Sequence, residues 1–197
     1  MTDLALGVRR AAWGVRALAV VLGAVLVALA AQVSIPLPGT PVPMTLQPMA
    51  VLLVGGLLGA RLGALSMILY LAMGAAGLPV FTPSPLLLPG IARLFGQTGG
   101  YLLAYPVAAW VTGWLNQPDG VRRVGAQHAA PLRVGMGVLA GLVLIHLGGL
   151  AQLAILTGNL SAAAGFGTWP FLLGDVLKIA VLVPVLTRLA PTIRARL

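Results

Sequence analysis

Cysteine is absent from this chain of 197 residues, and only three of its residues are acidic. The lack of cysteine excludes disulfides, thiolate catalysis and cysteine metal sites. The lack of acids leaves too few carboxylates for acid–base or metal-assisted hydrolysis, and neither a Gly-x-Ser-x-Gly nor a His-Glu-x-x-His motif occurs. We therefore expect a protein that is not an enzyme.

Charge is also scarce, since 8% of the residues are charged and 59% are hydrophobic. This balance is typical of an integral membrane protein. Six apolar runs are long enough to cross the hydrocarbon layer. The sequence predicts an all-α bundle of six transmembrane helices that forms one membrane domain over 1–197, with helices at about 17–33, 44–60, 62–78, 98–115, 134–156 and 169–189. Only Arg61 separates the second run from the third, and the glycines around it favour a tight helical hairpin over one long helix.

The net charge of +9 comes from arginines at the ends of the predicted helices. They form no contiguous patch, so we expect no nucleic-acid partner. The positive-inside rule places both termini in the cytoplasm. It assigns ten of the twelve basic residues to the inner side: Arg9, Arg10, Arg16, Arg61, Arg122, Arg123, Arg133, Arg188, Arg194 and Arg196. The alternative, a cleaved signal peptide at the N-terminus, would leave five helices and put the basic ends on opposite faces. Topology does not explain the other two, Arg93 and Lys178.

Asp175 and Lys178 lie inside the sixth apolar run. A charged side chain at membrane depth costs about 3 kcal/mol, so such residues are usually paired and functional. Spacing i and i+3 puts both on one helix face, in the outer half of the membrane. The alternative is a structural ion pair. With Arg93, this outer region carries one excess positive charge, which suits a small anion that also has hydrogen-bond donors for Asp175.

Two proline-rich connections flank the same outer side. The segment 34–43 holds four prolines and cannot be helical, so it serves either as a wall of a site or as a plain connector. The segment 79–97 is predicted to be a lid over a cavity, because its apolar side chains argue against disorder.

Polar residues gather near the outer ends of the predicted helices. Gln47 lies at the outer end of the second helix, and Gln32, Gln152 and Asn159 lie at the ends of other helices. Tyr101 suits either an interfacial aromatic belt or a ligand contact.

Two further features leave alternatives open. His146, midway along the fifth helix, suits a hydrogen bond to a neighbouring helix better than a proton relay. Ala24 and Ala28 form a small-xxx-small pair on the first helix, which fits either internal packing or close approach by a partner.

Five segments together resemble the BioY family, the biotin-specific S component of energy-coupling factor (ECF) transporters. They are SIPLPGTPVPMTLQ at 34–47, GARLGALS at 59–66, GLPVF at 77–81, TGGYL at 98–102 and GDVLK at 174–178. The resemblance implies a six-helix bundle in the prokaryotic cell membrane that binds biotin near the outer surface. It also implies a membrane coupling subunit and two ABC ATPases that hydrolyse ATP, so that this chain binds no cofactor itself. Dedicated ATPases, shared ATPases and a solitary homo-oligomer all remain open.

The resemblance also implies roles for particular residues. Asp175 and Lys178 match the family's acidic–basic pair, Arg93 matches a polar lid position, and Ala24 and Ala28 match the face that docks on the coupling subunit. The chain departs from the family at Gln97, where proline is usual, and in its proline-rich lid.

Biotin chemistry suits these residues. Asp175 would accept from a ureido N–H, Arg93 would bind the carboxylate, and Tyr101, Phe81 and nearby Met or Leu residues would cover the ring. Gln47 is a further expected contact, and Lys178 is the other cation available to the carboxylate. The rival hypothesis is a proton-coupled secondary transporter for a small organic anion, with Asp175 or His146 carrying the proton.

Overall fold

The computed structural model describes residues 2–83, 89–117 and 131–197, and the side chains from residue 13 onward. Arg122 and Arg123, assigned above to the inner side, lie outside the described residues, as does the 84–88 part of the predicted lid. The long helices are α1 (Thr2–Gln32), α2 (Gln47–Leu58), α3 (Ala60–Ala75), α4 (Gly99–Leu115), α5 (Pro131–Thr157) and α7 (Leu172–Arg194). The shorter elements are β1 (Ser34–Ile35), β2 (Met44–Thr45), η1 (Gly90–Phe95), α6 (Leu160–Gly167) and η2 (Trp169–Phe171).

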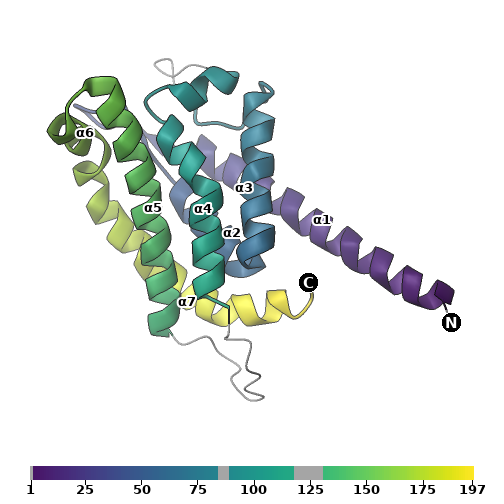
Figure 1. Ribbon diagram of the computed structural model, residues 1–197. Helices are drawn as coiled ribbons and strands as arrows, with labels where there is room; N and C mark the ends of the chain where they lie inside the picture. Colours follow the sequence, from purple (N-terminus) through teal and green to yellow (C-terminus); the bar gives the residue numbers. More distant parts are fainter. Residues whose placement is uncertain (1, 84–88, 118–130) are drawn as a thin grey trace.

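The described chain is an all-helical bundle apart from the β1–β2 hairpin (Figure 1). α4 packs along both α3 and α5, while the N-terminal part of α1 extends away from the bundle. Glycines set the close contact between α4 and α5. A methyl group added at Gly100 would strike the carbonyl of Gly148, so the two backbones meet directly. This contact holds together the two helices that carry Tyr101 and His146.

The predicted helical hairpin is confirmed. α2 ends at Leu58, α3 begins at Ala60, and Gly59 between them has a φ of 82°.

Arg194 at the end of α7 binds the same end of the bundle, because its guanidinium donates to the carbonyls of Gly56, Leu57 and Asn116. A basic side chain that binds the last carbonyls of two helices stabilises both C-terminal ends.

The bounds of several elements differ from the prediction. The segment 157–168, expected to be a loop, contains α6, and the Asn159 side chain caps it by accepting from the backbone N–H groups of Ser161 and Ala162. α1 is longer than 17–33, and η1 gives the predicted lid a helical turn. Asn159 is a typical helix-capping residue, but the apolar segment that follows it is too short to predict a separate helix from the sequence.

Three stretches are long and apolar enough to cross a membrane: Trp13–Gln32, Pro131–Thr157 and Leu160–Arg194. α2 and α3, with 12 and 16 residues, are shorter than these three stretches. At a rise of 1.5 Å per residue they reach only about 18 and 24 Å, against about 30 Å for the hydrocarbon layer. The junction at Gly59 limits their length. The structure thus shows a helical membrane protein with three candidate spans among the described residues.

The prediction that Ala24 forms a docking face is wrong. Ala24 has 0% of its surface exposed and belongs to the core, as do Val27 and Ala31 one turn apart on the same face. α1 packs on α3, and a side chain at Gly23 would strike Ser66. Ala24 therefore serves internal packing. Ala28 is only partly buried, and its docking role stays a prediction.

Candidate ligand-binding site

A pocket of about 630 Å³, counting the open space at its mouth, lies where the β1–β2 hairpin, η1 and the adjoining ends of α2, α4 and α7 meet. Five parts of the chain that are distant in sequence supply its walls. The lining residues are Val42, Pro43, Thr45, Gln47, Pro48, Phe81, Thr82, Arg93, Thr98, Tyr101, Leu102, Tyr105, Leu142, Ile145, His146, Phe171, Asp175 and Lys178.

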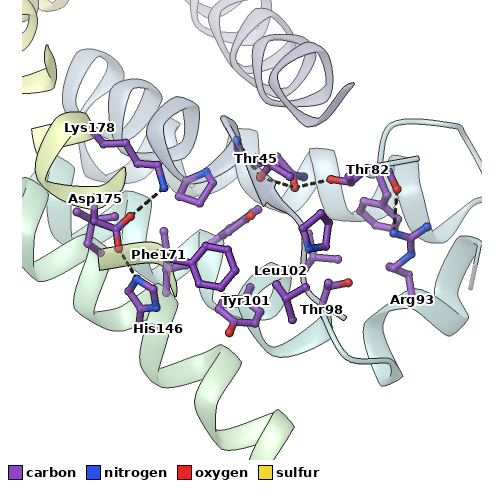
Figure 2. Close-up of a pocket in the computed structure, with 18 residues that line it drawn as sticks. Thr45, Thr82, Arg93, Thr98, Tyr101, Leu102, His146, Phe171, Asp175 and Lys178 are labelled. Carbon is purple, nitrogen blue, oxygen red and sulfur yellow. Dashed lines mark hydrogen bonds and ion pairs between the residues drawn. The ribbon is translucent and has the colours of Figure 1, made fainter. Parts of the chain in front are cut away.

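One end of the pocket holds a charged cluster of three side chains (Figure 2). The Nζ of Lys178 donates to Oδ1 of Asp175 at 2.8 Å, as the i, i+3 spacing predicts. The ring of His146, from α5, meets the other oxygen of Asp175, with Nε2 and Oδ2 2.6 Å apart. Asp175 and Lys178 are each 7% exposed. Two donors on one buried carboxylate hold it in a fixed orientation towards the pocket.

The other end holds a neutral hydrogen-bond network beside one cation (Figure 2). The hydroxyl of Thr82 donates to Oε1 of Gln47 at 2.9 Å, and Nε2 of Gln47 donates to the hydroxyl of Tyr70. The Nη1 of Arg93 donates to the backbone carbonyl of Thr82 at 2.9 Å. Burial lowers the pKa of the Arg93 guanidinium from its ordinary value, but arginine stays protonated at neutral pH. This end therefore carries a positive charge that lines the pocket.

Aromatic and aliphatic side chains separate the two polar ends. Figure 2 places Phe171, Tyr101 and Leu102 between the Asp175 cluster and Arg93. The hydroxyl of Tyr101 donates to the carbonyl of Gly167 at 2.6 Å, which fixes its ring against the pocket. Phe81 packs edge-on against Tyr70, with ring centroids 5.5 Å apart. Such an arrangement receives an apolar ring between two polar groups.

All six predicted contact residues line this one pocket: Asp175, Lys178, Arg93, Tyr101, Phe81 and Gln47. Their roles in binding stay predictions. The hairpin segment 34–43 contributes Val42 and Pro43, so it forms a wall. The other polar groups expected nearby serve the fold instead. Gln152 donates to the carbonyls of Leu94 and Gly96 and so anchors η1, Asn159 caps α6, and Gln32 donates to the carbonyl of Pro79.

Sequence reasoning missed several lining residues. His146 was expected to bond a neighbouring helix, which it does, but its partner is Asp175, 29 positions away. No local spacing links the two residues. Thr45, Thr82 and Thr98 were also missed as lining residues. The side-chain oxygen of Thr98 is buried and has no hydrogen-bond partner among the described residues, and Thr98 makes no side-chain cap on α4. Its position at the start of α4 was the only signal available in the sequence.

The fold and the pocket together define a helical membrane protein whose pocket suits a small molecule with two polar ends. The chain matches the BioY family over residues 5–195, and it belongs to that family.

Relatives of known name are similar along most of their length. A protein of Pyrococcus horikoshii described as a "probable biotin transporter BioY" is 35% identical over 83% of this chain and 89% of its own. The "biotin transporter BioY" of Thermotoga maritima is 34% identical over 83% of this chain and 89% of its own. The "biotin transporter BioY" of Rhizobium etli is 33% identical over 80% of this chain and 83% of its own.

One solved structure has the same fold. It is described as the S component for biotin from an ECF-type ABC transporter. It superposes with a TM-score of 0.73 over 88% of this chain and 89% of its own, at 23% identity. The helical arrangement in Figure 1 is therefore that of a known S component.

Proposed function

We propose that this chain binds biotin and is the biotin-specific subunit of an ECF-type importer. The observation that carries the proposal is the division of the pocket into a buried Asp175–Lys178 end, an aromatic middle and an Arg93 end. Biotin has the same three parts in the same order: a ureido group, an apolar thiophane ring and a chain that ends in a carboxylate. Two of the relatives named above are described as biotin transporters and one as a probable biotin transporter, which supports the same ligand.

The geometry supports one orientation of the ligand. The carboxylate of Asp175 accepts from a ureido N–H, and Lys178 balances its charge and donates to the ureido oxygen. Phe171 and Tyr101 pack on the ring. Arg93 receives the ligand carboxylate, for which its planar fork is suited. One ureido N–H, the ureido oxygen and the carboxylate of biotin then each meet a group of opposite character.

We propose further that uptake is driven by partner subunits. As the resemblance to the BioY family implies, these are a membrane coupling subunit and two ABC ATPases; the similar S component is itself described as part of an ECF-type ABC transporter. ATP is hydrolysed there, and this chain binds no cofactor of its own. The protein lies in the prokaryotic cell membrane with six spans and with both termini in the cytoplasm. Without ATPase partners, the chain would act as a homo-oligomer.

The rival function, proton-coupled secondary transport, requires the chain alone to accumulate its substrate when a pH gradient is present. Proteoliposomes that contain only this chain should bind biotin but should not accumulate it when a pH gradient is imposed. Addition of the coupling subunit, the two ATPases and internal or external ATP should start accumulation. Accumulation by the chain alone, abolished when the gradient is dissipated, would support the rival function instead.

The topology can be mapped directly because the chain has no native cysteine. We expect Ser161→Cys, at an exposed position of α6, to react with an impermeant maleimide from outside the cell. Arg61→Cys, exposed at the α2–α3 junction, should react only after the membrane is permeabilised. External labelling of Arg61→Cys would contradict the proposed orientation.

The two alanines of α1 should behave differently when enlarged. Ala28→Trp should reduce ATP-driven uptake by about ten-fold or more and leave the Kd for biotin within about threefold, if Ala28 faces the coupling subunit. Ala24→Trp should reduce the melting temperature, because Ala24 is buried in the core. Leu22→Trp, at a side chain 58% exposed on α1, is the matched control and should be neutral. Parallel loss of binding and uptake in Ala28→Trp would assign Ala28 to internal packing.

A further inference from the structure

The His146 side chain contacts two acceptors at once. Its Nε2 lies 2.6 Å from Oδ2 of Asp175, and its Nδ1 lies 3.3 Å from the carbonyl oxygen of Gly167. Neither acceptor can donate when the carboxylate is ionised, so the ring must supply the proton on the short contact through Nε2. The ring is fixed further by Tyr101 and Phe171, whose ring centroids each lie 6.4 Å from it. His146 is thus held as a donor to Asp175.

The His146–Asp175 contact determines the direction in which the unoccupied acceptor positions of the Asp175 carboxylate point. A carboxylate has about four acceptor positions over two oxygens. Lys178 occupies one on Oδ1, and His146 occupies one on Oδ2. The remaining positions can serve a ligand only if the carboxylate keeps this orientation. Lys178 alone constrains one oxygen, and the carboxylate could still rotate about its Cβ–Cγ bond; a second donor on the other oxygen, from a different helix, removes that freedom.

We propose that His146 is a positioning residue for biotin, acting through Asp175: its Nε2–H locks the carboxylate so that a remaining acceptor position faces one ureido N–H of the ligand. This inference rests on the proposed function. The His146–Asp175 contact also joins α5 to α7 at this end of the pocket, because the two residues belong to those helices (Figure 2). The site is then a three-residue unit, Asp175–Lys178–His146, rather than the ion pair that the sequence predicts.

A double-mutant cycle separates this role from simple packing. His146→Phe keeps a ring of similar size without a donor and should weaken biotin binding by about ten-fold. His146→Gln restores a donor and should stay within about threefold of the unaltered protein. In an Asp175→Asn background, His146→Phe should change the affinity by less than about twofold, because the group it positions is gone. Equal losses in both backgrounds, or no loss in His146→Phe, would overturn the proposal.

A spectroscopic measurement tests the same contact without biotin. The chain has two histidines, so His128→Gln leaves His146 as the single source of imidazole signals. Nitrogen-15 NMR of the ligand-free full chain should show a protonated Nε2, and Asp175→Asn should shift that signal. An unprotonated Nε2, or a signal insensitive to Asp175, would overturn the proposal. Failure of the unaltered chain to bind biotin would contradict the proposed function, and this measurement would still decide whether His146 donates to Asp175.

Discussion

Asp175→Asn should weaken biotin binding by about 10–150-fold, which corresponds to about 1.5–3 kcal/mol. The substitution keeps the size of the side chain but replaces an acceptor-only carboxylate with an amide. Lys178 and His146 both donate to this group at present, and Lys178 would keep a charge that is only 7% exposed. The ligand loses a charge-assisted hydrogen bond, and the pocket loses the charge that balances Lys178. Isothermal titration of the purified variant measures the change.

The control for this variant must separate lost binding from lost folding. Thr112→Val removes a buried hydrogen bond, from the Thr112 hydroxyl to the carbonyl of Gly137 at 3.1 Å, and Thr112 does not line the pocket. We expect it to lower the melting temperature without changing the Kd. An Asp175→Asn protein that keeps the affinity of the unaltered chain would leave Asp175 with a purely structural role.

Arg93→Ala should have the second largest effect, and the effect should depend on the ligand's carboxylate. Arg93 lines the pocket at the end away from Asp175 and is 6% exposed. Removal of a charge-assisted contact should weaken biotin by about 10-fold or more. Biotin amide, which has no carboxylate charge, should bind the unaltered protein more weakly and should lose little further affinity in Arg93→Ala. The comparison of the two ligands isolates the carboxylate from every other contact.

Two further variants sharpen the result. Arg93→Lys keeps the charge but loses the planar fork, so a bidentate contact should weaken measurably. Arg61→Ala removes an exposed arginine at the opposite end of the bundle and should leave both ligands unaffected. Equal losses for biotin and its amide in Arg93→Ala would mean that Arg93 does not bind the carboxylate. The carboxylate would then be assigned to Lys178.

Much of the site could be predicted because its signals are local in sequence. The i, i+3 spacing of Asp175 and Lys178 determines their contact, since a helix brings such side chains together wherever it packs. The helical hairpin could also be predicted, because glycines cluster around Arg61 between the two apolar runs. The structure places the junction two residues earlier, at Gly59, whose φ of 82° glycine adopts easily. Arg93 was identified because its position opposes the charge bias that governs the other arginines.

The remainder depends on tertiary packing. His146 meets Asp175 only because α5 and α7 lie side by side, and nothing in the sequence within either helix determines their relative rotation. The burial of Ala24 has the same origin. The small residues around Ala24 predict that another helix packs closely against α1. The same pattern suits a helix of this chain and a helix of a partner subunit, so it does not distinguish them. The structure supplies α3 as the neighbour of α1.

Titration of the purified full chain with biotin, without nucleotide and without a proton gradient, tests the central claim most directly. We expect saturable binding tighter than about 1 μM, since this chain alone supplies the polar side chains that line the pocket. Riboflavin and thiamine, which lack a cyclic urea joined to a carboxylate chain, should not compete. Absence of biotin binding by folded protein, or equal affinity for all three vitamins, would contradict the account.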